Sequence, residues 1–274
     1  MPERFILDLG GRSVPVKASE GGARVGLVVT SAPSAGSIFS EKHLSGARYE
    51  PIVVTTSSND TRPLFDWITT AWRGTVAKKN GAVIRADGNG TPRDKREFVN
   101  GVLIETTIPM LDGSSRNPAD FTLRIAPELT RDVAPPTTLP ISPVGRDQFM
   151  SSNFRLAING LDCTRVSKID SFTVKQKLSP NIVEYPNIRI ELSAASVASW
   201  RTWFQSFVVD GHSSSTDEKA GTLSFLSPDL SRVLATISFF NLGIFRLETV
   251  PASEPSRVVA DLYCERMDLA LPAT

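Results

Sequence analysis

The stretch Tyr49-Glu-Pro-Ile-Val-Val-Thr-Thr-Ser-Ser-Asn-Asp-Thr-Arg-Pro-Leu-Phe-Asp-Trp67 has a counterpart later in the chain. In this stretch a tyrosine opens an extended segment, and a tryptophan follows 18 residues later. The counterpart begins at Tyr185 and reaches Trp203 after the same 18 residues. Each copy predicts a short strand that leads into an amphipathic helix. We therefore interpret the chain as two versions of one unit.

Four further patterns occur once in each half, in the same order. The pairs are residues 5–11 with 154–160, 81–87 with 221–226, 98–109 with 239–251, and 121–125 with 258–264. Apolar residues alternate with others in residues 5–11, 154–160 and 258–264, which is typical of strands that bury one face. A glycine opens residues 81–87 and 221–226, and residues 98–109 and 239–251 share an aromatic residue, Asn, glycine, aliphatic residues, Thr and Pro in one order. The pattern predicts a mainly β fold, a sandwich or barrel with one α-helix per unit.

The predicted helices carry apolar residues at helical spacing. These residues are Leu64, Phe65, Trp67, Ile68 and Trp72 in the first unit, and Val197, Trp200, Trp203, Phe204, Phe207 and Val208 in the second. Asn59, Asp60 and Thr61 are good N-caps for the first helix, and Ser193 or Ser196 for the second. Stripes of this kind usually pack on a sheet, so we expect both helices to belong to the core rather than to a ligand site.

The first unit is about 13 residues longer than the second between its opening strand and its tyrosine. After a predicted strand at residues 25–29, the extra residues are rich in Ser, Gly and Ala, and they surround Ile38, Phe39, His43 and Leu44. Apolar side chains among small residues favour a long surface loop with a docking point. A disordered insertion is the alternative that the sequence leaves open.

Prolines separate the two units. Pro135, Pro136, Pro140 and Pro143 fall within nine positions, where neither a helix nor a strand ladder can continue. We expect a first domain at residues 1–130, a stiff linker at 131–148 and a second domain at 149–274.

The composition is ordinary for a soluble globular protein, with 41% hydrophobic and 22% charged residues among 274. Thirty basic and 29 acidic residues give a formal charge of +1, which does not favour capture of nucleic acid. The chain has no apolar run long enough for a membrane span. Its first residues do not resemble a secretory signal, so we expect synthesis in the cytoplasm.

The sequence shows no catalytic, cofactor-binding or metal-binding constellation. His43 and His212 have no acid or cysteine at ligand spacing, and Cys163 and Cys264 are expected to be small buried residues rather than a disulfide. The run Asp87-Gly-Asn-Gly90 lacks the features of a phosphate or calcium loop and predicts a hairpin turn. We expect no enzyme and no cofactor; an active site assembled from distant residues is the least favoured hypothesis.

The order of these elements resembles the tail-tube proteins of contractile phages and phage-tail-like injection systems, relatives of the secretion-system tube protein Hcp. In the first unit the similar residues are Tyr49-Glu-Pro-Ile52, Leu64-Phe-Asp-Trp67-Ile and Lys79-Asn-Gly81. In the second they are Gly160-Leu-Asp162, Ser167-Lys-Ile-Asp170, Trp203, Gly221-Thr-Leu and Phe239-Phe-Asn241. The resemblance covers nearly the whole chain apart from the proline linker.

This resemblance implies six-membered rings that stack into a tube around a channel for DNA or protein cargo. Family members usually carry one unit per chain, so three copies of a two-unit chain would form a pseudo-hexameric ring; a hexamer of chains is the alternative. The implied partners are further copies of the chain, sheath proteins and baseplate proteins, within a virion tail or phage-tail-like particle. The residues Ile38, Phe39, His43 and Leu44 would then reach an adjacent ring.

Two other roles remain open at this stage. The chain could join the end of the tube to a baseplate hub of the same particle. It could also be a soluble two-domain β-sandwich that binds ligands at the loop after Gly36 or at Ser213-Ser-Ser-Thr216. Assembly into rings favours the tube hypothesis, and saturable binding by a monomer favours the binding protein.

Overall fold

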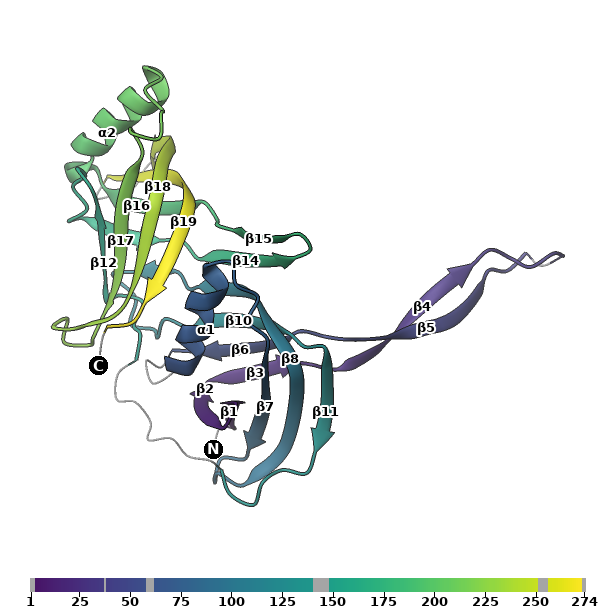
Figure 1. Ribbon diagram of the computed structural model, residues 1–274. Coiled ribbons are helices and arrows are strands. Elements are labelled where there is room, and N and C mark those ends of the chain that lie inside the picture. Colours follow the sequence, from purple (N-terminus) through teal and green to yellow (C-terminus); the bar gives the residue numbers. More distant parts are fainter. Residues whose placement is uncertain (1–2, 37, 58–61, 140–147, 251–255, 273–274) are drawn as a thin grey trace.

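The computed structural model describes residues 3–36, 38–57, 62–139, 148–250 and 256–272. The chain is mainly β, as the alternating patterns predict, and strands form two large antiparallel sheets and one separate hairpin. The N-terminal sheet curls around helix α1, and the C-terminal sheet stands beside it and carries helix α2 at its far end (Figure 1). No helix among the described residues has the length and apolarity that crossing a membrane requires.

The N-terminal sheet has the strand order β2-β1-β7-β8-β10-β6-β3. Its strands are β1 (Arg4–Leu9), β2 (Arg12–Val16), β3 (Ala18–Gly21), β6 (Ile52–Thr56), β7 (Lys79–Ala86), β8 (Pro92–Ile108) and β10 (Phe121–Ala126). β11 (Leu129–Val133) pairs with the first half of β8. Strand pairing thus continues past Arg131, where the linker is expected to begin, because Arg131 pairs with Glu97 and the pairing extends to Val133 before the prolines begin.

A long hairpin projects from this sheet. β4 (Arg24–Ser31) and β5 (Glu41–Tyr49) pair with each other and extend away from the rest of the molecule (Figure 1). The strands extend into both ends of the predicted loop, because β4 continues to Ser31 and β5 begins at Glu41, with Val29 opposite His43.

The C-terminal sheet has the order β12-β17-β18-β19-β16-β13-β9. Its strands are β12 (Phe154–Ile158), β13 (Val166–Ile169), β16 (Ile188–Ser193), β17 (Lys219–Leu226), β18 (Val233–Thr249), β19 (Arg257–Ala270) and the short β9 (Leu111–Asp112). From β12 to β13 this order matches the order β1-β7-β8-β10-β6-β3 in the N-terminal sheet, element for element along the chain.

The helices follow β6 and β16. α1 (Arg62–Trp72) is a single α-helix, whereas the second helical segment consists of the 3-10 turn η1 (Ala194–Ser196), α2 (Ala198–Phe204) and the π-helix η2 (Gln205–Val209). Ser193 caps η1 by accepting a hydrogen bond from the Ala195 N–H, and Asp210-Gly211 ends η2 with a left-handed glycine. The predicted caps Asn59, Asp60 and Thr61 lie outside the described residues.

Strands cross between the two parts in both directions. The hairpin of β14 (Phe172–Leu178) and β15 (Asn181–Glu184) belongs to the C-terminal part by sequence, yet β14 pairs with the end of β8. In return β9 pairs with β13. The division into two units remains a prediction, and such units would be intertwined rather than joined only by a linker.

One continuous core runs through both parts. Four phenylalanine rings pack within it in tilted and edge-to-face contacts, namely Phe65, Phe121, Phe149 and Phe225, with neighbouring centroids 5.1–5.5 Å apart. Phe65 and Phe121 come from the N-terminal sheet and its helix, and Phe225 comes from β17. Aromatic contacts of this kind add to the apolar area that each ring buries, so they tie the two sheets together.

Candidate assembly surface

The contact between the two parts combines strand pairing with matched side chains. β14 lies antiparallel to β8, with Phe172 opposite Ile108, Thr173 opposite Thr107, Val174 opposite Thr106 and Lys175 opposite Glu105. The hydroxyls of Thr107 and Thr173 hydrogen-bond at 2.8 Å. Lys175 and Glu105 place opposite charges across the strands, which favours this register. The edge of the N-terminal sheet therefore accepts a hairpin that comes from the C-terminal part of the chain.

Helix α1 adds further contacts between the N-terminal and C-terminal parts. The Thr69 hydroxyl donates a hydrogen bond of 2.8 Å to the Leu269 carbonyl of β19, and Arg73 pairs with Asp268 at 2.8 Å. The Tyr185 hydroxyl donates to the carbonyl of Trp72 at the end of the helix. α1 thus packs on its own sheet with one face and on the C-terminal part with another.

The two helical segments differ in how fully their apolar side chains are buried. The structure buries Leu64, Phe65, Trp67, Ile68 and Trp72 in α1. In the second helical segment it buries Val197, Trp200, Trp203 and Phe207, leaves Phe204 half-buried, and exposes 43% of Val208 and 60% of Val209. Val208, which the stripe predicts to be in the core, lies in the π-helix η2 and is exposed, whereas Phe207 of the same turn is buried. Apolar side chains at the end of this helix therefore face solvent.

The end of β18 is an open strand edge. Up to Leu242, β18 lies between β17 and β19, but from Arg246 to Thr249 the described part of the chain pairs it with β19 alone. Phe245, just before this segment, is 45% exposed. Backbone N–H and C=O groups along such an edge can accept another strand.

Charged side chains occupy this edge. Arg246 pairs with Glu248 at 2.6 Å and approaches the buried Asp261 of β19 at 3.8 Å. The hydrogen bond from Arg246 lowers the pKa of Glu248, so this carboxylate stays charged near neutral pH. Charges on an exposed edge discourage indiscriminate pairing, which favours a specific partner strand.

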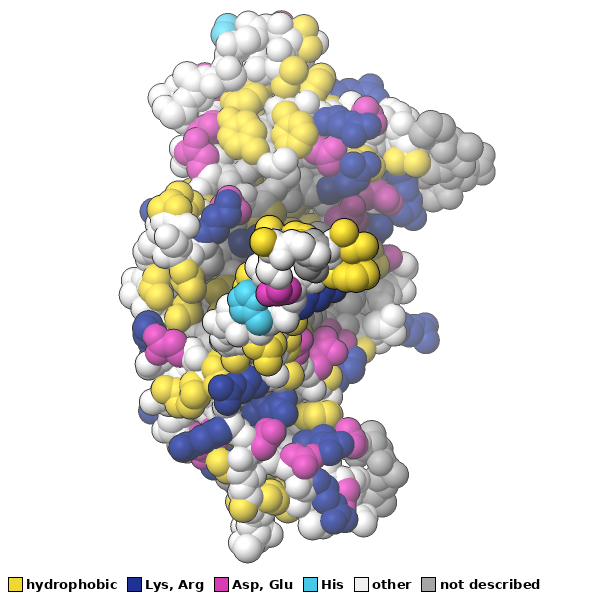
Figure 2. Space-filling model, turned by 90° about the vertical axis from the view of Figure 1, so that its right-hand side faces the viewer, with side chains coloured by type: hydrophobic (Ala, Val, Ile, Leu, Met, Phe, Trp, Pro, Cys, Tyr) yellow, Lys and Arg dark blue, Asp and Glu magenta, His cyan; other side chains and the backbone are white. Residues whose placement is uncertain are grey.

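The tip of the β4–β5 hairpin is the most exposed apolar group of the described residues. Ile38, Phe39 and Leu44 expose 85%, 75% and 71% of their surface. Figure 2 looks at this tip end-on and shows apolar side chains and one histidine gathered on it. Ile38, Phe39, His43 and Leu44 thus lie toward the end of the projecting hairpin, where another molecule can reach them. Large apolar side chains grouped at such a place are typical of an interaction site.

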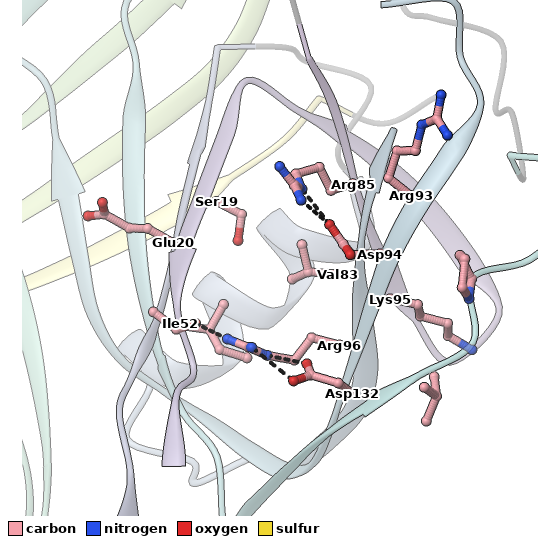
Figure 3. A pocket seen from close by; sticks show the side chains of 13 residues that line it. Ser19, Glu20, Ile52, Val83, Arg85, Arg93, Asp94, Lys95, Arg96 and Asp132 are labelled. Carbon is pink, nitrogen blue, oxygen red and sulfur yellow. Dashed lines mark hydrogen bonds and ion pairs between the residues drawn. The ribbon is translucent and has the colours of Figure 1, made fainter. Parts of the chain in front are cut away.

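A cavity of about 610 Å³ lies beside β3, β7, β8 and β11. Two pairs of its charged side chains form ion pairs with each other: Arg96 with Asp132 at 2.7 Å, and Arg85 with Asp94 (Figure 3). Arg93, also on its wall, pairs with Asp87 at 2.6 Å. Most charged side chains of this cavity are therefore exposed and engaged in ion pairs, which is typical of a solvated surface.

The described residues contain no group of three or more histidine, cysteine or acidic side chains that could hold a metal ion. His212 contacts the Ser206 hydroxyl at 3.3 Å, and both cysteines are free thiols. Asp87 accepts hydrogen bonds from the N–H groups of Asn89 and Thr91, and the latter, with Arg93, lowers its pKa. This carboxylate closes a hairpin turn, as the run Asp87-Gly-Asn-Gly90 predicts.

Two parts of the assembly surface were not identified from the sequence. The hairpin β14–β15 and the open end of β18 carry no motif, and the alternation of Phe172, Val174 and Gln176 was the available signal for a strand. That alternation identifies a buried face but does not say which sheet supplies the partner.

No protein-family model and no curated protein matches this chain. Among solved structures, it is similar to a chain from the sheath/tube terminator of PVC, an extracellular contractile injection system, with 20% identity and a TM-score of 0.41. A chain from the PVC sheath-tube complex has 20% identity, and one from the tube-terminating cap of the anti-feeding prophage has 18%, both with a TM-score of 0.41. Each match covers 48% of this chain and, in this order, 94%, 88% and 88% of the other.

Proposed function

We propose that this chain is a structural, non-enzymatic subunit of a phage-tail-like tube, and that three copies close into a ring of six similar units. The observation that carries the proposal is the strand exchange within the chain. β14 of the C-terminal part already completes the edge of β8 in the N-terminal part. If the two parts are versions of one unit, the same contact repeated between copies closes a ring, and a closed ring leaves no strand edge open.

Repeated local features support the two-unit interpretation. A lysine ammonium lies over a tryptophan ring in each part, with Lys79 5.5 Å from Trp67 and Lys219 5.4 Å from Trp203. Asn100 in β8 and Asn241 in β18 both have a left-handed backbone, with φ of 50° and 55°. Positive φ is uncommon outside glycine, so its occurrence at matching places favours a common origin of the two parts.

The β4–β5 arm supports a role in stacking. Among the described residues, the projecting hairpin β4–β5 lies in the N-terminal part, and its C-terminal counterpart β14–β15 is shorter, so a ring of three chains would present three arms. Their apolar tips would contact the next ring or, at the end of a tube, a baseplate or terminator protein. Incorporation into a tail or injection particle, with sheath and baseplate proteins as neighbours, follows from this proposal.

The mass of the purified full-length chain in solution tests the proposal. Light scattering combined with negative-stain electron microscopy is expected to give three chains per particle and rings or stacked tubes with a central channel. A mass of six chains in a single-layer ring would contradict the threefold arrangement. Monomers at every concentration and salt tested would contradict self-assembly and favour the two-domain binding protein.

A further inference from the structure

We infer that residues 23–25, at and just before the start of β4, pair antiparallel with residues 246–248 of β18 in a second copy of this chain, in a defined register. The inference rests on the proposed ring and deepens it by assigning the surface between copies. It follows from comparing the contact between β14 and β8 within the chain with two other segments. One is the open edge of β18, and the other is residues 23–25, which follow the buried Gly22, whose N–H donates to the Pro51 carbonyl and whose carbonyl accepts from the Thr130 hydroxyl.

The open edge of β18 corresponds to the occupied edge of β8. Counted from the left-handed asparagines Asn100 and Asn241, Glu105 matches Arg246 and Ile108 matches Thr249. The neighbouring strands agree with this count. Glu105 pairs with Arg124 of β10 at 3.5 Å, and Arg246 approaches Asp261 of β19 at 3.8 Å, so the same cross-strand ion pair recurs with its charges reversed. On its other side Glu105 faces Lys175 of β14, whereas no strand of the described residues lies beside Arg246 there.

The start of β4 corresponds to β14 by two independent counts. In the first count, Ser19 of β3 lies opposite Val54, and Ile169 of β13 lies opposite Ile190. Val54 follows Tyr49 by five residues, and Ile190 follows Tyr185 by five residues, so Ser19 matches Ile169. Counting three residues on matches Gly22 to Phe172.

The second count starts from the other strand of each hairpin. Val25 lies opposite Arg48, and Lys175 lies opposite Glu184. Arg48 and Glu184 each precede the tyrosine by one residue, so Val25 matches Lys175, as the first count requires.

These matches define the register between copies. Lys175 lies opposite Glu105 within the chain, so Val25 is placed opposite Arg246. Ala23 then lies opposite Glu248, at the position that Thr173 and Thr107 occupy.

The side chains around these strands suit the contact. Within the chain, the hydroxyl of Tyr185 reaches the carbonyl of Trp72 at the end of α1. Tyr49, the matching tyrosine, would reach the corresponding end of the second helical segment in the other copy, where Val208 and Val209 are exposed. Arg24 lies beside Tyr49, with its guanidinium carbon 6.0 Å from the ring. A cation at the C-terminal end of a helix is favourable, because the last carbonyls carry partial negative charge.

Disulfide cross-linking between copies tests this register. Residues directly opposite each other in an antiparallel pair have Cα atoms about 5 Å apart, within the range that a disulfide spans. Full-length Ala23→Cys and Glu248→Cys variants, each in a Cys163→Ser background, are purified separately, mixed and oxidised. We expect a covalent heterodimer in the mixture and none in either variant alone. Ala23→Cys with Leu247→Cys is the matched control, since neighbouring residues of a strand point to opposite faces.

The outcomes separate the register from the proposed function. Particles of three chains that form no cross-link above the control would overturn this pairing but leave the ring intact. Monomers without any cross-link would overturn both. Val25→Cys with Arg246→Cys is a second in-register pair, for use if one substitution of the first pair impairs folding. We expect the same cross-link between copies. Assembled particles that do not form it would contradict the register.

Discussion

At the scale of single residues, Cys264 is a buried thiol whose chemistry follows from its environment. It lies on β19, and its single S–H can donate a weak hydrogen bond to the carbonyl of Arg266 at 3.1 Å or of Phe240 at 3.5 Å. Burial raises its pKa from 9.0 to about 11, because the thiolate would be poorly solvated there. Cys163 is half-buried, and its pKa is raised for the same reason. These thiols are therefore weak nucleophiles at neutral pH.

Alkylation of Cys264 is expected to be slow at pH 8 and to accelerate about tenfold per pH unit up to pH 10, because the rate follows the thiolate fraction. The folded state keeps this thiol protonated above the pH at which the unfolded chain ionises it. Stability from this group is thus complete below about pH 9 and decreases as pH rises toward 11.

Iodoacetamide labelling of a Cys163→Ser variant, followed by intact-mass spectrometry, measures the rate. The Cys264→Ala variant serves as the control for labelling elsewhere. Rapid modification at pH 7 in the folded protein would contradict the buried, protonated state of this thiol.

At the scale of elements, the β4–β5 hairpin departs most from the usual rule that apolar side chains are buried. Its tip exposes Ile38 and Phe39, while the hairpin β14–β15 uses its backbone to complete a sheet. The two hairpins follow matching strands but have different lengths. β14 of the shorter hairpin pairs with β8, whereas the longer hairpin β4–β5 projects away from the rest of the molecule (Figure 1).

Replacing Ile38 and Phe39 together by serine is expected to leave the mass of a single ring unchanged and to prevent rings from stacking, because the apolar contact between rings is lost. The length distribution of particles in negative-stain micrographs measures this effect. Leu178→Ser with Ile182→Ser is a matched control, since these residues expose 45% and 48% of their surface on the shorter hairpin. Tubes of normal length from the tip variant would show that the arm does not join rings.

At the scale of the whole molecule, the two sheets share their strands and their core. β14 and β9 cross between them, and the ring of Phe225 lies 5.2 Å from that of Phe121. Neither part can unfold without exposing residues of the other. Cooperative unfolding of the chain as one unit follows, although the chain is long enough for two separate domains.

Phe225→Ala is expected to destabilise the chain by about 3–5 kcal/mol, the usual cost of emptying a buried phenylalanine site, without splitting the transition. Urea unfolding followed by tryptophan fluorescence and by far-UV circular dichroism measures this, and the two signals should coincide. Val209→Ala at an exposed position should change stability by less than about 0.5 kcal/mol. Two separate transitions in the wild-type chain would contradict a shared core.

The sequence alone determined the local structure of this protein. Alternating residues identified strands such as β10 and β19, apolar stripes identified both helices, and the spacing from each tyrosine to its tryptophan pointed to two similar units. These features could be predicted because side-chain periodicity depends on neighbours a few residues apart.

Only the tertiary structure decided which edges meet. The backbone groups of a strand edge are the same in every sequence, so nothing local directs Phe172 to Ile108 of another sheet or leaves Arg246 without a partner strand on one side among the described residues. The register appears only when the sheets are packed around a common core, because burial of one face then excludes a shift by one residue. For the same reason the candidate surface, a strand edge rather than a set of reactive side chains, could not be read from the order of residues.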